Sequence, residues 1–297
     1  MKVIKSNYIK FISAAMVNNA PNQISDSSII YPPASQPLWS STTSYVIGNY
    51  VTHNKYVYIC KANSSAGLIP SDNPSLWLNQ GLSVRYLLTD LSTSTYSNFG
   101  TSGGFFVILQ AQGDSLALLN LNNVGTITVS AVNSSTLVSV YSATTFTLNG
   151  KSDFFISNLP NIALTPINIT VTLTPYISGN VYVGSCVWGN ITDIGDTQYG
   201  ASTGITDYSY RSTDTFGNLT VTLRTYAKRI SSNLMINNSK LDSVFNFLAA
   251  NRSMPMVWIG SDNTYSSLIT FGVWKDFDIN IAYPDYSSCS LTVEGLA

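Results

Sequence analysis

The strand pattern of the middle region limits the fold of this chain more than any other feature. Between residues 83 and about 190, short apolar or alternating runs predict strands at 105–110, 116–121, 126–132, 146–148, 167–173 and 181–188. Turn-forming residues separate several of these runs, namely Asn122-Asn123, Asn149-Gly150 and Ser178-Gly179-Asn180. Short strands with such spacing are typical of a β-sandwich or a jelly roll. We therefore predict a mainly β protein with a sandwich-like or jelly-roll-like domain over residues 83–190.

The composition also favours strands over helices. Charged residues make up 10% of the chain, against roughly 25% in an average globular protein, and Glu294 is the only Glu. The deficit is filled by Ser, Thr, Asn, Tyr and Gly, a mixture that suits strands and turns. The net charge is −1, whereas a nucleic-acid binder carries a basic surface. We therefore expect no nucleic-acid partner.

The last third of the chain predicts one helix. Apolar residues recur there on one helical face: Leu241, Val244, Phe245, Leu248 and Ala249. Ser239, with Asp242 three residues later, resembles an N-terminal capping signal, and Pro255 would stop the helix. Strands are predicted on both sides, so residues 191–297 should form an α+β domain with one main helix. The boundary near residue 190 stays open, because the middle and last regions could share one sheet.

The N-terminal residues 1–37 show no clear period. Pro21, Pro32, Pro33 and Pro37 favour extended, exposed chain. Two interpretations stay open, a disordered leader and an N-terminal arm that lies on a neighbouring subunit. No apolar stretch reaches the length of about 20 residues that spans a bilayer, so we expect no membrane partner.

Residues 38–82 form a small unit rich in aromatic residues. His53-Asn54-Lys55 lies between two alternating runs, 50–52 and 56–59, and this arrangement predicts a hairpin. A loop with Pro70 and Pro74 precedes Trp77. We expect a compact β-module here.

The residues that ordinarily carry chemistry are sparse. His53 is the only histidine, and a predicted turn is a poor place for the base of a nucleophile system. The three cysteines, Cys60, Cys186 and Cys289, are far apart and are interpreted as buried small apolar residues. We expect no enzyme activity, no metal site and no cofactor.

One acidic stretch leaves alternatives open. Asp193, Asp196, Asp207 and Asp214 lie in a Gly-rich segment. Asp commonly forms turns by accepting hydrogen bonds from nearby backbone amides. Several carboxylates brought together in space could instead bind Ca²⁺ or hydrolyse a glycosidic bond. Turn formation is the preferred interpretation.

The unit at 38–82 resembles the small chitin-binding-type carbohydrate-binding modules. The matching residues, in order, are Trp39, Tyr45, Gly48, Val51, Tyr58, Pro70 and Trp77. The resemblance implies a short twisted sheet with Trp39, Tyr58 and Trp77 in its core, and exposed aromatic residues that stack on sugar rings. The sequence has Asn63 and Ser64 where the family often carries stacking aromatics. The remaining candidates for glycan or partner contacts are Tyr45, Tyr50 and Tyr56.

The rest of the chain resembles tail-associated structural proteins of tailed bacteriophages. The segments that carry this resemblance are 113–121, 195–209, 214–218, 224–229, 257–260 and 293–296. The resemblance implies a virion structural protein of the tail, baseplate or collar, assembled in the host cytoplasm and held to other virion proteins by protein–protein contacts. The alternative is a receptor-binding tail protein that docks host surface glycans.

The composition also predicts self-association. Phe, Tyr and Trp make up 12% of a chain that carries few charges, and Tyr and Trp are enriched at interfaces. Exposed edge strands also need cover. We expect a homo-oligomer, a ring or cluster of copies.

Overall fold

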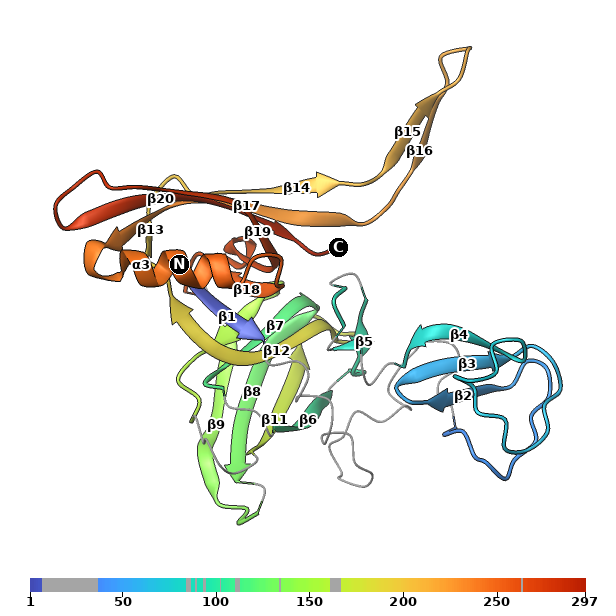
Figure 1. Ribbon diagram of the computed structural model, residues 1–297. Coiled ribbons are helices and arrows are strands. Elements are labelled where there is room, and N and C mark those ends of the chain that lie inside the picture. The colour runs from blue at the N-terminus through green and yellow to red at the C-terminus, as the bar shows by residue number, and fades with distance from the viewer. Residues whose placement is uncertain are drawn as a thin grey trace.

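The computed structural model is mainly β, as predicted, with one main helix near the C-terminus (Figure 1). It describes residues 1–6, 37–83, 87–88, 90–92, 95–101, 103–109, 113–133, 135–160, 167–262 and 264–297. The strands of these residues form a large curled sheet, a four-stranded sheet, a three-stranded sheet and a separate two-stranded pair.

The largest sheet of the described residues has 11 antiparallel strands. Its main path is β10-β7-β12-β1-β18-β19-β20-β17-β13, while β5 also pairs with β12 and β14 also pairs with β17. Its strands are β1 (Lys2–Ser6), β5 (Ser97–Asn98), β7 (Ser115–Asn122), β10 (Phe154–Ile156), β12 (Tyr182–Asp193), β13 (Asp196–Thr197), β14 (Ser202–Asp207), β17 (Tyr226–Asn237), β18 (Met256–Ile259), β19 (Ile269–Asn280) and β20 (Tyr286–Gly295).

The middle region is a β-sandwich, as predicted. Its second sheet has the order β6-β11-β8-β9, with β6 (Gly103–Leu109), β8 (Val124–Asn133), β9 (Ser139–Thr147) and β11 (Ile167–Pro175). One apolar core joins this sheet to the β7-β10-β12 part of the large sheet, and it includes Leu116, Leu118, Ile127, Val171 and Trp188. Alternation along the strands produces this core, because every second side chain points to the same face.

The middle and last regions share one sheet. Strand β12 runs from Tyr182 to Asp193, across the predicted boundary near residue 190, and β1 connects it to β18. The sequence had left this arrangement open as the alternative to a domain boundary.

The first residues differ from the predicted arm. Lys2–Ser6 form the strand between β12 and β18, whereas most of the predicted arm lies outside the described residues. The side chains of Val3 and Ile4 are fully buried on opposite faces of the sheet. A strand covered on both faces needs no alternating pattern. The adjacent apolar residues Val3 and Ile4 therefore gave no period that would predict this strand.

The main helix α3 (Leu241–Ala250) covers one face of the large sheet. Val244 and Leu248 are its buried residues and pack in one core with Leu234, Trp258 and Leu291. A separate core that includes Ile4, Val257 and Phe271 lies on the other face of the sheet.

The cap of this helical segment differs from the prediction. The short 3₁₀ turn η2 (Asn238–Lys240) precedes α3, and Asn237 caps that turn because its Oδ1 accepts from the backbone N–H of Ser239 at 2.9 Å. The N-cap residue of α3 is Lys240, without a side-chain cap hydrogen bond, so Ser239 does not cap α3. The helix ends at Ala250, before Pro255.

The module is a three-stranded sheet of β2 (Tyr50–His53), β3 (Tyr56–Cys60) and β4 (Trp77–Leu82). The predicted hairpin is confirmed: Asn54 and Lys55 connect β2 and β3, and both have positive φ, 46° and 77°. That geometry fits a two-residue hairpin turn. Tyr58 and Trp77 are buried in the module core, and the partly buried Trp39 packs against it.

Candidate interaction surface

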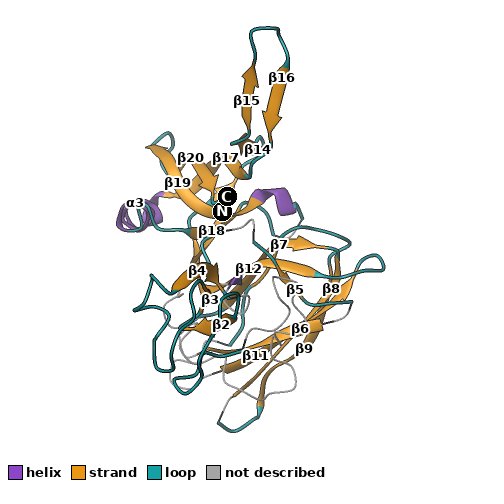
Figure 2. Ribbon diagram, turned by 90° about the vertical axis from the view of Figure 1, so that its right-hand side faces the viewer, coloured by secondary structure: helices purple, strands orange, loops and turns teal. Residues whose placement is uncertain are grey.

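A two-stranded ribbon extends away from the body of the protein (Figures 1 and 2). Strand β15 (Tyr210–Thr213) pairs with β16 (Leu219–Thr222), and they form a sheet of their own. We call residues 208–224 the ribbon. It continues the β14–β17 pair, whose last pairing joins Asp207 to Tyr226.

One face of the ribbon is apolar and open to solvent. Arg211 lies opposite Val221 and Thr213 lies opposite Leu219, so these four side chains share one face. Leu219 is 64% exposed and Val221 48%, and Leu223, just beyond β16, is 86% exposed. Exposed apolar residues that gather on one element mark an interaction site.

The tip of the ribbon presents the apolar side chain of Phe216, and the carboxylate of Asp214 accepts the hydrogen bonds that hold the turn. Phe216 is 88% exposed. Asp214 Oδ1 accepts from the backbone N–H groups of Phe216 and Asn218, at 2.9 and 2.8 Å, and Asp214 Oδ2 accepts from the side-chain amide of Asn218. These hydrogen bonds from Asn218 and Phe216 lower the pKa of Asp214.

The other aspartates of the acidic stretch also serve the backbone. Asp207 accepts from the backbone N–H of Ser209 and pairs with Arg211, and Asp193 accepts from the backbone N–H of Gly195. The preferred turn-forming interpretation is confirmed for Asp193, Asp207 and Asp214, while Asp196 lies in β13. Within the described part of the chain, no three His, Cys, Asp or Glu side chains come together as metal ligands would.

The fold of the tip should depend on Asp214, because its carboxylate accepts from Phe216 and Asn218. We expect Asp214→Ala to let the amides of residues 208–224 exchange at rates close to those of unstructured chain, because an isolated two-stranded hairpin is only marginally stable in water. Thr215→Ala in the same turn is the control and should leave exchange unchanged. Hydrogen exchange followed by mass spectrometry measures both. Equal protection in the two variants would contradict the role of Asp214.

Acid should loosen the same element. The folded-state pKa values of Asp207 and Asp214 are lowered, chiefly by hydrogen bonds from Ser209 and Asn218. A lowered pKa means stability that is present above the ordinary Asp value of 3.8 and is lost as pH falls toward the folded-state value. Ribbon amide protection should therefore fall below about pH 4. Protection that stays constant down to about pH 2 would contradict this.

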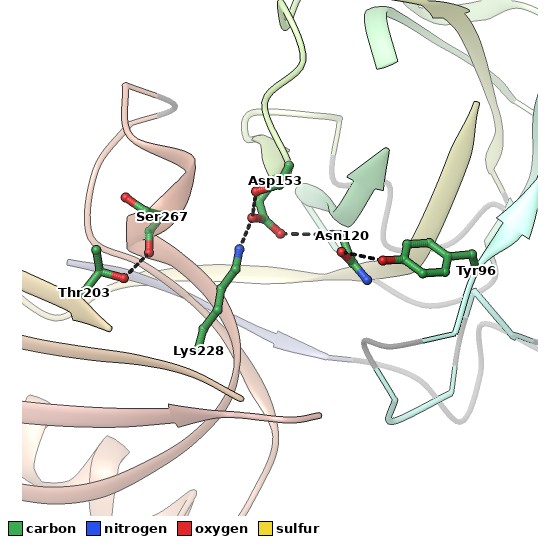
Figure 3. A network of polar contacts seen from close by, with 7 residues as sticks. Tyr96, Asn120, Asp153, Thr203, Lys228 and Ser267 are labelled. Atoms are coloured by element: carbon green, nitrogen blue, oxygen red, sulfur yellow. Dashed lines mark hydrogen bonds and ion pairs between the residues drawn. The ribbon is translucent and has the colours of Figure 1, made fainter. Parts of the chain in front are cut away.

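A polar network joins the sandwich to the C-terminal strands (Figure 3). Lys228 of β17 forms an ion pair with Asp153, which is buried and also accepts from the Asn120 backbone N–H at 3.0 Å and the Ser152 hydroxyl at 2.6 Å. The Tyr96 hydroxyl donates to Asn120 Oδ1 at 3.3 Å. These residues, apart from Ser152, line a small cavity of about 130 Å³. Its two charges are paired with each other, so we interpret the network as structural.

The three candidate tyrosines of the module do not form one exposed row. Tyr45 is only 8% exposed, its ring contacts Trp77 edge-on at 5.2 Å, and its hydroxyl accepts from the Ser40 backbone N–H. Tyr50 lies opposite Ile59 and Tyr56 lies opposite His53, so Tyr50 and Tyr56 point to opposite faces of the β2–β3 pair. The aromatic platform that glycan docking was expected to use is therefore not formed by these residues.

The single histidine packs against an aromatic ring. His53 lies at the end of β2, and its ring contacts Trp39 edge-on at 5.1 Å. The cysteines are free and buried, as predicted: Cys60, Cys186 and Cys289. Burial raises the pKa of Cys289 to about 11 and the pKa of Cys186 still further above its ordinary range. These two thiols are therefore poor nucleophiles.

The sequence did not identify the apolar face of the ribbon. The run from Leu219 to Leu223 alternates apolar and polar residues, a pattern that predicts a strand with one buried face. No signal in the run distinguishes a face buried within the chain from one left open to a partner. The Asp214–Asn218 segment, which carries part of the resemblance to phage tail proteins, was the nearest indication.

No helix among the described residues is long and apolar enough to cross a bilayer. Comparison of the chain with protein-family models, with curated proteins and with solved structures finds no match.

Proposed function

We propose that this protein is a structural component of a tailed-bacteriophage virion, in the tail, baseplate or collar, and that it acts through protein–protein contacts. The observation that carries the proposal is the ribbon, which presents Phe216, Leu219, Val221 and Leu223 to solvent far from the body of the protein. A free protein gains nothing from such an element, since it stabilises no core. A neighbour that covers it would stabilise both the ribbon and the contact.

The apolar face of one ribbon is too small to bind a partner tightly by itself, so the proposal requires an assembly in which several such contacts form together. Full burial of a Leu, Val or Phe side chain contributes about 1.5–3 kcal/mol, so the four residues together supply roughly 6–12 kcal/mol before costs. Association costs about 4–15 kcal/mol in lost freedom and ordering. A single ribbon contact is therefore weak. Several such contacts in one particle add up, because each further contact forms within an existing complex.

Three of the segments that resemble phage tail proteins lie in or next to this ribbon. Residues 195–209 lead through β13 and β14 to its base, residues 214–218 form its tip, and residues 224–229 return into β17. Three of the six segments that suggested a virion role thus build or flank the exposed element, while 113–121, 257–260 and 293–296 lie in or next to β7, β18 and β20. This coincidence supports the proposal, which also places the protein in the virion beside other virion proteins.

The test uses purified particles of the phage or prophage that encodes the chain. We expect mass spectrometry to find the wild-type protein in tail-containing particles. A variant in which Asn-Gly replaces residues 208–225 should fold but fail to enter particles. Asn-Gly is the two-residue connection that closes an antiparallel pair, and here it would join Asp207 to Tyr226.

A milder variant separates loss of the apolar face from loss of the ribbon. Leu219→Thr, Val221→Thr and Leu223→Thr together keep the strand preference and should also block incorporation. Thr220→Ser with Thr222→Ser, on the other face, is the matched control and should incorporate normally. Absence of the wild-type chain from particles, or normal incorporation of the shortened variant, would overturn the proposal.

A further inference from the structure

We infer that the ribbon of one copy docks on the opposite end of the large sheet of a second copy, at the turn between β19 and β20. The inference rests on the proposed assembly function and names the partner surface. The inference follows from two exposed apolar surfaces of opposite charge, the ribbon and the β19–β20 turn. Strand β17 runs between them and fixes the distance from one to the other.

The receiving surface lies where β17, β19 and β20 end. Ile281 is 70% exposed, Tyr283 67% and Tyr286 45%. Tyr286 lies opposite Asn237, and Met235 lies opposite Ser288, so Tyr286 and Met235 share the face of the sheet that points away from α3. The helix covers only the other face, where Cys289 and Leu291 are buried. This end therefore presents apolar side chains that the described residues do not cover.

The charges of the two surfaces are complementary. Within the ribbon, Arg211 and Arg224 outnumber Asp214, which gives a net charge of +1 for residues 208–224. Asp207, at the base of the ribbon, pairs with Arg211 within the chain at 3.3 Å, so Asp278 of a second copy would share or replace that partner. Residues 276–286 contain Asp276, Asp278 and Asp285 and no basic residue, which gives −3. Such complementarity orients two surfaces and disfavours contact between like surfaces. It favours ribbon on sheet end over ribbon on ribbon.

Individual residues place these charges beside the apolar side chains. Arg211 shares the ribbon face of Leu219 and Val221. Asp278 lies opposite Ser290 and is exposed, and because Ser290 is two residues from Ser288, Asp278 shares the face of Tyr286 and Met235. Each surface thus combines exposed apolar side chains with one charged side chain on the same face.

The geometry makes the contact head-to-tail. Strand β17 begins beside the base of the ribbon and ends beside Tyr286. Its 12 residues span eleven steps of roughly 3.3 Å, so the two surfaces are about 36 Å apart. Figure 1 shows them at opposite ends of the sheet. A chain therefore cannot fold its own ribbon onto its own β19–β20 turn. Head-to-tail contacts build rings when the rotation closes and filaments when it does not.

Cross-linking between two differently tagged full-length chains tests the inference. One chain carries Val221→Cys and the other carries Ile281→Cys, and a short bis-maleimide joins them, in solution at high concentration and in purified particles. Native Cys60, Cys186 and Cys289 are buried. We expect the mixed product to exceed at least about tenfold the product of Val221→Cys with Ser142→Cys, on the outer strand β9, a ratio that corresponds to about 1.4 kcal/mol.

Charge reversal then tests the pairing. Arg211→Asp in the first chain should lower the mixed product about tenfold, and Asp278→Arg in the second chain should restore it. Restoration excludes a mere loss of the ribbon, since a damaged ribbon would not recover through a change in its partner.

Three results would overturn the inference. They are no mixed product in either setting, equal product from Val221→Cys chains with one another, and no restoration by Asp278→Arg. If the ribbon cysteine in particles cross-links to a different virion protein, the self-docking inference fails while the proposed function stands. If the chain is absent from particles, the proposed function itself fails.

Discussion

Val3→Asp is expected to leave no cooperatively folded protein. Val3 is fully buried in the core that joins α3 to the large sheet, and its strand β1 pairs with β12 on one side and β18 on the other. A carboxylate there costs several kcal/mol, whether it is ionised or is protonated without a partner. That cost is comparable to the roughly 5–15 kcal/mol by which a typical domain is stable. Because β1 also holds β12 beside β18, its loss should separate the two halves of the sheet.

The measurement is thermal unfolding followed by circular dichroism, with solubility as a second readout. Lys2→Ala is the matched control on the same strand. Lys2 pairs with Asp262 at 2.8 Å on the surface, and such exposed pairs contribute about 0–1 kcal/mol, so this variant should unfold nearly like the wild type. A Val3→Asp protein with a wild-type unfolding transition would show that β1 is not an integral strand.

Lys228→Met should destabilise the protein by about 3 kcal/mol, because removing one partner of a buried ion pair leaves an uncompensated charge. Asp153 is 4% exposed and would keep only its hydrogen bonds from Asn120 and Ser152. Because the Asp153–Lys228 ion pair lies between the sandwich and β17, its loss should weaken the packing of the sandwich against β17. Urea unfolding of the full chain measures the change.

The double variant Lys228→Met with Asp153→Asn provides the control. The amide introduced by Asp153→Asn would retain an oxygen that accepts from the Asn120 backbone N–H without a buried charge, so most of the lost stability should return. If the double variant is no more stable than Lys228→Met, the loss comes from the packing of the Lys228 side chain and the charge argument is wrong.

Local patterns predicted much of the fold. The His53–Lys55 hairpin and the face of α3 were predicted from turn chemistry and helical spacing. Each of these depends on neighbours in sequence. Strand β1 depends on partners near residues 190 and 257, and no local pattern reports such distant pairing.

The candidate surface was harder to predict than the fold. Tyr45 lies between exposed residues in the sequence, yet its ring packs on Trp77 and its hydroxyl has a backbone partner. Leu219 and Val221 show the opposite case, since their alternation predicts burial and they are exposed. Alternation fixes which side chains share a face, while the chain's path in space decides whether that face is covered.

A cryo-microscopy map of the tail-containing particle tests the central claim most directly. The account predicts density for this chain in multiple copies, with Phe216, Leu219, Val221 and Leu223 of each ribbon covered by a neighbouring molecule. A complete particle in which the chain is missing, or in which the ribbon lies in solvent with these side chains uncovered, would contradict it.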